Sequence, residues 1–220
     1  FRPDYMKIGR LRQELNNPPC LALTATATTR VQADIGERLA LRDPLSVVTG
    51  FRRENLALSV RLCASLGEKL AALDRLVKQC DKGTVLVYGA TRRTVEEVAS
   101  WLGQSYPAVG YYHAGLSDEE RRLVHEEFRR GELRILVATN AFGMGIDKAD
   151  VRLVVHIDIP GSLEAYYQEA GRAGRDGEPS HCELFFNFAD TKTQEFFIEG
   201  ANPSFETIRD IYQTLLNWAD

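Results

Sequence analysis

Thr84-Val85-Leu86-Val87-Tyr88-Gly89-Ala90-Thr91-Arg92 contains, in nine residues, the unit on which the rest of the chain is built. Its first five residues are apolar or β-branched and do not alternate with charged ones, as is typical of a strand buried on both faces of a parallel sheet. The Gly-Ala-Thr that follows makes a corner, and Thr91 can cap a helix that we expect over residues 91–102. A strand, a corner and a helix in this order indicate an α/β fold.

The same unit recurs along the chain. Leu153-Val154-Val155, for example, is another short β-branched run without alternation. We expect strands at 20–24, 45–48, 56–62, 84–88, 109–112, 134–138, 153–157 and 182–187, and helices at 5–15, 29–41, 67–79, 91–102, 117–130, 162–171 and 205–218. Alternating strands and helices predict a parallel sheet between two layers of helices, a three-layer α/β fold.

Composition limits the classes of protein that this chain can belong to. Of its 220 residues, 44% are hydrophobic and 26% are charged, and no apolar run approaches the length of a membrane helix, about 20 residues. The formal net charge of −4 argues against a protein that holds nucleic acid by bulk charge alone. Four scattered cysteines without metal-ligand spacing predict reduced, mostly buried thiols in an intracellular protein, and no metal site.

Three expected strands end in polar, glycine-containing corners, at 89–92, 113–117 and 139–148. Each corner alone is ordinary helix capping, and His113 alone is best explained as a structural hydrogen-bonding residue. Gly143-x-Gly145 lacks the third glycine of a dinucleotide fingerprint, because Lys148 stands there. Because ligands gather at the carboxyl ends of parallel strands, the three corners together predict a grip on consecutive phosphates of one nucleic-acid strand.

The segment Gln168-Glu169-Ala170-Gly171-Arg172-Ala173-Gly174-Arg175-Asp176-Gly177 brings together an amide and two guanidinium groups. On a continuous helix Gln168, Arg172 and Arg175 occupy positions i, i+4 and i+7, so we expect them on one face. Rigid guanidinium forks suit phosphate oxygens. The alternative interpretation is a helix end with two solvated arginines.

At these residues the chain resembles the RecQ-type superfamily 2 DNA helicases. Leu21 to Ala27 resembles motif III of that family, and residues 112–116, 137–148 and 166–177 resemble its later blocks, including motifs V and VI. The resemblance extends to about residue 190, in the family's order and spacing. DEAD-box RNA helicases usually carry a His where Gln168 stands, so the DNA-helicase branch fits better.

The resemblance implies a role in ATP hydrolysis for five residues. Arg175 corresponds to the arginine finger, which stabilises negative charge that develops during phosphoryl transfer, and Arg172 and Gln168 support it. Gly145 and Asp147 line the same nucleotide cleft. The fold implied is the RecA-like parallel sheet of a helicase C-terminal lobe.

The resemblance also implies a DNA site along the three corners. The residues expected to hold the single strand are Thr91, Arg92, His113, Gly115, Thr139 and Asn140. Thr24 and Thr26 are expected to couple the nucleotide site to the interface between two lobes.

By the same resemblance the chain has four parts. Residues 1–48 correspond to the C-terminal part of a first RecA-like lobe, 49–55 to an inter-lobe connector, 56–190 to the second lobe, and 191–220 to a helical extension.

Two ATPase motifs are absent from the sequence, a G-x-x-x-x-G-K-[ST] phosphate loop and an Asp-Glu-x-His. Both precede this region in the family, and Phe1 has the character of an interior cut. We therefore expect ATP and Mg²⁺ to be bound mainly by a missing N-terminal RecA-like lobe, and this chain alone to be inactive. The expected partners are that lobe and single-stranded or duplex DNA, with no membrane.

The resemblance implies translocation in the 3′–5′ direction, which the residues themselves do not indicate. Two alternatives remain open, an RNA-remodelling ATPase on the same two-lobed plan and a non-catalytic module that only binds nucleic acid.

Overall fold

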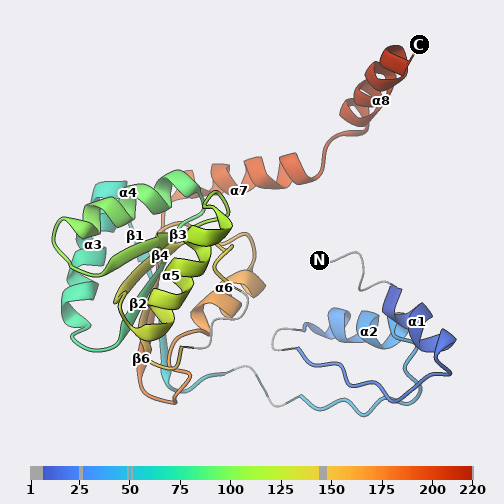
Figure 1. Cartoon of the computed structure of the whole chain (residues 1–220), viewed down its shortest axis with the longest axis horizontal. Helices are drawn as coiled ribbons and strands as arrows, with labels where there is room; N and C mark the ends of the chain where they lie inside the picture. Colours follow the sequence, from blue (N-terminus) through green and yellow to red (C-terminus); the bar gives the residue numbers. More distant parts are fainter. Residues whose placement is uncertain (1–6, 25–26, 49, 51, 144–147, 220) are drawn as a thin grey trace. The chain divides into compact units, whose positions relative to one another are not determined.

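The computed structural model describes residues 7–24, 27–48, 50, 52–143 and 148–219, which form two compact units divided between Arg53 and Glu54 (Figure 1). In the first unit, α1 (Ile8–Glu14) and α2 (Thr29–Arg38) are both shorter than the helices predicted there. Thr28 begins α2 as its N-cap and accepts a hydrogen bond from the Val31 N–H.

The strands predicted at 20–24 and 45–48 are wrong, because the structure has no strand at either place. The apolar side chains of both segments lie in solvent: Leu21 is 80% exposed, Leu23 83% and Leu45 90%. A strand exists only through ladder hydrogen bonds to a neighbouring strand. The described residues of the first unit contain no such neighbour, so the apolar pattern alone does not produce one.

The second unit is built on a six-stranded sheet in which every pair of neighbouring strands is parallel. The spatial order is β1-β6-β5-β2-β4-β3. The strands are β1 (Leu56–Leu62), β2 (Thr84–Tyr88), β3 (Val109–Tyr112), β4 (Ile135–Ala138), β5 (Val151–His156) and β6 (Ser180–Phe186). The predicted parallel sheet is confirmed.

Helices cover both faces of this sheet, so the predicted three-layer architecture is also confirmed (Figure 1). The helices are α3 (Leu66–Gln79), α4 (Arg92–Gly103), α5 (Asp118–Arg130) and α6 (Leu163–Ala170). Successive residues of a strand point to opposite faces. Val85 and Val87 of β2 therefore pack with α3 and α4, whereas Leu86 and Tyr88 pack with α5 and α6.

The helix α7 (Phe188–Ala201) follows β6 directly and precedes α8 (Phe205–Ala219). Most of α7 lies in the helical extension expected at 191–220, although the residue pattern itself placed a helix only at 205–218. α7 has no buried residue, so its sequence does not show the apolar stripe that predicts a helix packed against a core. The signal that identifies it is a capping box: the Asn187 N–H donates to Asp190 Oδ2 at 3.2 Å, and the Asn187 side chain accepts the Ala189 N–H. No described helix is both long and apolar enough to cross a membrane.

Candidate functional site

The structure brings the three predicted corners to one edge of the sheet. β2, β4 and β3 are consecutive neighbours, and their last residues are in register, because Ala138 pairs with both Tyr88 and Tyr112. The connections that follow these three strands therefore begin side by side at one edge of the sheet. The corners form one continuous edge, as the sequence predicted.

The corner after β2 is held by short-range hydrogen bonds. Thr91 Oγ1 accepts the Thr94 N–H at 3.1 Å and so acts as the N-cap of α4. The Ala90 N–H donates to Asp158 Oδ2 at 2.8 Å, so this amide is already engaged. Arg92, at the start of α4, is exposed. The available positive charge at this corner is therefore on the Arg92 side chain.

His113 and Gly115 form the corner after β3. His113 is 4% exposed; its Nδ1 accepts the Gly115 N–H at 3.1 Å, so its Nε2 donates to Glu96 Oε1 at 2.9 Å. A Cβ added at Gly115 would lie 2.8 Å from Arg92 Nη1, so the Arg92 guanidinium packs directly over Gly115. Arg92 thus connects the first two corners. His113 has a structural role, because its hydrogen bonds link the Gly115 backbone to Glu96.

The corner after β4 places its two predicted residues differently. Thr139 is 7% exposed, and its Oγ1 accepts the Ala141 N–H at 3.4 Å inside the corner. Asn140, the next residue, is exposed. Only Asn140 of this pair has a side chain that is open to solvent.

The arginine segment is not a continuous helix, and the prediction of one helical face for Gln168, Arg172 and Arg175 is wrong. α6 ends at Ala170, and the residues from 171 to 176 are turns. Gly174 has φ +56°, a left-handed conformation that an α-helix does not contain. Gln168 therefore lies on α6, whereas Arg172 and Arg175 lie on the turn that follows, which we call the arginine turn (residues 171–178).

Arg172 and Arg175 differ in their surroundings. Arg175 is exposed, as is Gln168, but Arg172 is half-buried. A Cβ at Gly143 would lie 3.3 Å from Arg172 Nη2, so this guanidinium contacts the connection that follows β4. Burial raises the pKa of Tyr88, and the positive charge of Arg172 opposes part of that shift. The structure therefore brings the arginine turn into contact with the connection that follows β4, and Arg175 of the same turn is exposed.

Three predicted site residues, Thr26, Gly145 and Asp147, lie outside the described residues. Thr24 lies in the first unit and is exposed. The four cysteines are free thiols; Cys63 and Cys182 are buried, Cys80 is half-buried and Cys20 is exposed, so the prediction of mostly buried thiols is correct for only half of them.

Two buried polar groups beneath the site were missed by sequence reasoning. His156, at the end of β5, is fully buried, and its Nε2 lies 3.0 Å from Oε2 of Glu169, the neighbour of Gln168 on α6. Lys69 of α3 is 4% exposed and donates to Asp190 Oδ2 at 2.7 Å. The sequence signal for both groups was a titratable residue inside or beside an apolar run. Such a residue is stable in a buried position only when it has a hydrogen-bonding or ionic partner.

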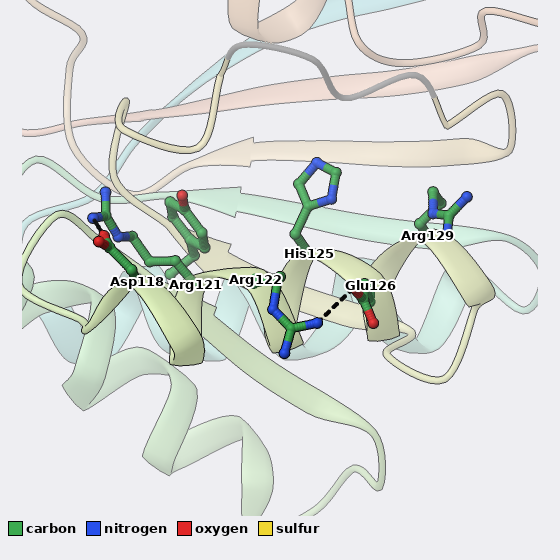
Figure 2. A pocket seen from close by; sticks show the side chains of 7 residues that line it. Asp118, Arg121, Arg122, His125, Glu126 and Arg129 are labelled. Carbon is green, nitrogen blue, oxygen red and sulfur yellow. Dashed lines mark hydrogen bonds and ion pairs between the residues drawn. The ribbon is translucent and has the colours of Figure 1, made fainter.

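A groove of about 520 Å³ runs along α5 beside Tyr112 (Figure 2). Three arginines line it, but Figure 2 shows that two of them are paired with acids of the same helix. Arg121 pairs with Asp118, and Arg122 pairs with Glu126 at 3.1 Å. Because these charges cancel, the groove has little excess positive charge, as is typical of a solvated helix face.

Comparison with known proteins gives a consistent picture. Residues 68–177 match the family model "Helicase conserved C-terminal domain". The chain is 39% identical over 216 residues to the probable ATP-dependent DNA helicase RecS of Bacillus subtilis, covering 98% of this chain and 43% of the relative. It is 44% identical over 201 residues to ATP-dependent DNA helicase RecQ of the same organism, covering 90% and 33% respectively.

The chain spans less than half of the length of these relatives. Among solved structures, Saccharomyces cerevisiae Dbp5 bound to RNA and ADP BeF3 is similar, with a TM-score of 0.67 and 23% identity, covering 87% of this chain and 51% of that one. At this identity the likeness supports the RecA-like fold and nothing further. The chain belongs to the helicase conserved C-terminal domain family, in its RecQ-type branch.

Proposed function

We propose that this chain supplies the arginine finger and a single-strand-binding surface to an ATP-dependent DNA helicase of the RecQ type. The observation that supports this most directly is the exposed Arg175, which stands on a tightly anchored turn beside Arg172. Family membership and the DNA-helicase relatives give the proposal its reaction and its substrate class. The 3′–5′ direction rests on the family resemblance alone.

In this proposal Arg175 faces a nucleotide that is held mainly by a preceding RecA-like lobe. ATP supplies the γ-phosphoryl group whose hydrolysis drives movement. The Arg175 guanidinium stabilises the negative charge that develops on the transferred group, an effect worth about 10³–10⁵ in rate for arginine fingers. Arg172 is half-buried against the Gly143 connection, so it orients the surface from which Arg175 projects and adds positive charge.

In this proposal Mg²⁺ is not bound mainly by the residues that the structure describes. Among the residues that the structure describes, no group of three or more His, Cys, Asp or Glu side chains is arranged to hold a metal ion. In this proposal the ion is held mainly by the preceding lobe. This agrees with the absence of an Asp-Glu-x-His motif from the sequence.

The DNA strand is proposed to lie along the common edge of the three corners. Arg92 and Asn140 offer exposed side chains there, while Thr91, His113, Gly115 and Thr139 shape the backbone beneath. An amide side chain and a guanidinium group suit phosphates without base recognition. With a net charge of −4, the chain alone should bind single strands weakly and in a salt-sensitive manner.

Arg175→Ala in the full-length protein tests the arginine-finger role. We expect at least a roughly hundredfold loss of DNA-stimulated ATPase activity, with the melting temperature unchanged because Arg175 is exposed. Arg93→Ala is the matched control, since Arg93 is exposed on α4 and pairs with Glu97 of the same helix. ATP turnover by Arg175→Ala within twofold of the control would refute the finger role and favour a non-catalytic module.

The second candidate function is an RNA-remodelling ATPase, because the chain is also 41% identical over 209 residues to a putative ATP-dependent RNA helicase of Acanthamoeba polyphaga mimivirus. Comparing the unwinding of matched DNA and RNA duplexes by the full-length protein separates the two. Faster unwinding of the DNA duplex is the expected result.

A further inference from the structure

The arginine turn is held from one side by a single amide group far away in the sequence. Asn55 Nδ2 donates one hydrogen bond to the Gly174 carbonyl oxygen at 2.8 Å and another to the Glu178 carbonyl oxygen at 2.9 Å. Both amide hydrogens are therefore used, one at the middle of the turn and the other at its last residue. Gly174 and Arg175 share a peptide bond, so the group that fixes the Gly174 carbonyl also fixes the start of Arg175.

The other side of the turn is held by β5 and β6. The Gly174 N–H donates to the Val151 carbonyl oxygen at 2.9 Å, and Asp176 forms an ion pair with Arg152. Arg152 also donates to Ser180 Oγ at 3.0 Å, and the Ser180 N–H donates to the Asn55 carbonyl oxygen at 2.8 Å. The turn thus lies between strand β5 and the Asn55 side chain, with contacts on both sides.

Gly174 shows how closely Asn55 approaches. A Cβ at this position would lie 2.4 Å from Asn55 Nδ2 and 2.8 Å from Ser180 Oγ. Such distances leave no room for any side chain, and the φ of +56° disfavours one independently. Only glycine lets the Asn55 amide reach the main chain of the turn.

We infer that Asn55 is a positioning residue for Arg175 and links the geometry of the arginine turn to the segment that enters the second unit. Asn55 immediately precedes β1 and ends the connector predicted at 49–55. A displacement of the chain at Asn55 is passed through its amide to the Gly174 carbonyl, and from there to Arg175. The inference rests on the proposed function, because it assigns Asn55 a task in the same reaction.

The chemistry of this contact requires a donor with two hydrogens. Aspartate has almost the same shape as asparagine, but its carboxylate only accepts hydrogen bonds, so it would repel both carbonyl oxygens. Alanine removes the contact and leaves two carbonyl groups that water can reach in part. Asn55→Asp should therefore disturb the turn more than Asn55→Ala.

The test uses the full-length protein and steady-state ATPase kinetics with saturating DNA. We expect Asn55→Ala to lower kcat about tenfold and Asn55→Asp about a hundredfold, with the KM for ATP within about threefold of wild type, because misplacing a charge-stabilising group affects the transition state most. Asn202→Ala is the matched control: its side-chain amide also donates to a main-chain carbonyl, that of Ile198 at 2.9 Å, but at the end of α7.

Amide hydrogen exchange on the 220-residue chain supplies a second readout. Asn55→Ala should speed exchange at Gly174, Gly177 and Ser180, whose N–H groups bond within or beside the turn, while the amides of β2 and β5 stay protected. Loss of protection throughout the sheet would assign Asn55 to general stability and overturn the inference.

The kinetic outcomes separate this inference from the proposed function. If Arg175→Ala abolishes turnover while both Asn55 variants match Asn202→Ala, the positioning role is refuted and the finger role stands. A raised KM with unchanged kcat in the Asn55 variants also refutes it. If Arg175→Ala itself keeps full ATPase activity, the finger role is refuted, and with it the positioning role of Asn55 that rests on it.

Discussion

The Nζ of Lys69 lies 2.7 Å from Oδ2 of Asp190 and joins the first turn of α3 to the first turn of α7. The same ammonium donates to the Ile157 carbonyl oxygen at 2.6 Å and lies 3.6 Å from Asp158 Oδ1. Asp158 in turn accepts the Ala90 N–H of the corner after β2. One buried cation therefore connects the ends of two strands with the starts of two helices.

Lys69→Met should destabilise the chain by about 3–5 kcal/mol, because it keeps the apolar stem but leaves two carboxylates in a buried site without a positive partner. Urea unfolding measures the loss. Lys78→Met is the matched control: Lys78 is also 2.7 Å from an aspartate, Asp74, but its side chain is 66% exposed whereas that of Lys69 is 5% exposed. We expect the control to cost at most about 1 kcal/mol, and equal losses in the two variants would contradict the structure.

Gly174→Ala should cost more stability than Gly177→Ala. Both glycines have positive φ, +56° and +87°, so alanine at either position incurs about 1–2 kcal/mol of backbone strain. At Gly177 a Cβ has no neighbour within 4 Å, whereas at Gly174 it meets Asn55, Glu178 and Ser180. Overpacking adds about 1–3 kcal/mol at Gly174. Thermal and urea unfolding of the two variants give the comparison, and a larger loss at Gly177 would show that the packing at Gly174 is described wrongly.

Glu183 makes part of the free energy of unfolding depend on pH in the acid range. Burial alone would raise the pKa of this carboxyl, but hydrogen bonds from Ser59, His181 and Arg61 outweigh it and hold the pKa below the ordinary value of 4.5. The unfolded chain therefore binds the proton more tightly, so this contribution is complete above about pH 4.5 and is lost as the pH falls through the folded-state pKa.

Urea unfolding between pH 7 and pH 3 tests this sign with Glu183→Gln, which cannot titrate. The wild-type chain should lose more free energy of unfolding below about pH 4.5 than the variant does. The difference between them should therefore shrink as the pH falls. A difference that stays constant over this interval would mean that Glu183 is not held ionised by its partners.

Local sequence was enough to predict most of the second unit. β1, β2 and β3 begin and end where the pattern places them, because short apolar runs bounded by polar or glycine residues allow little choice of register. The helix expected at 117–130 begins with a capping box of Ser117 and Glu120, in which the Ser117 N–H donates to Glu120 Oε2 at 2.8 Å. Each of these features depends on residues within one turn or one strand.

The errors have two physical causes. The segment 20–24 is apolar enough for a strand, but a strand needs a partner, and the described residues of its unit offer none. In the arginine segment, helical spacing predicted one face, but Gly171 ends α6 and Gly174 takes a left-handed conformation. Glycine permits that conformation without requiring it, so tertiary contacts decide.

The sequence by itself determined the kind, the order and most of the boundaries of the elements in the second unit, and the type of side chain at each corner. It did so because periodicity, capping and strand–helix alternation act between near neighbours in the chain. Only the tertiary structure decided the strand order, the packing of Arg172 against the Gly143 connection, and the contact of Asn55 with Gly174 across 119 positions. These depend on which distant surfaces bury each other, and local preferences do not specify that choice.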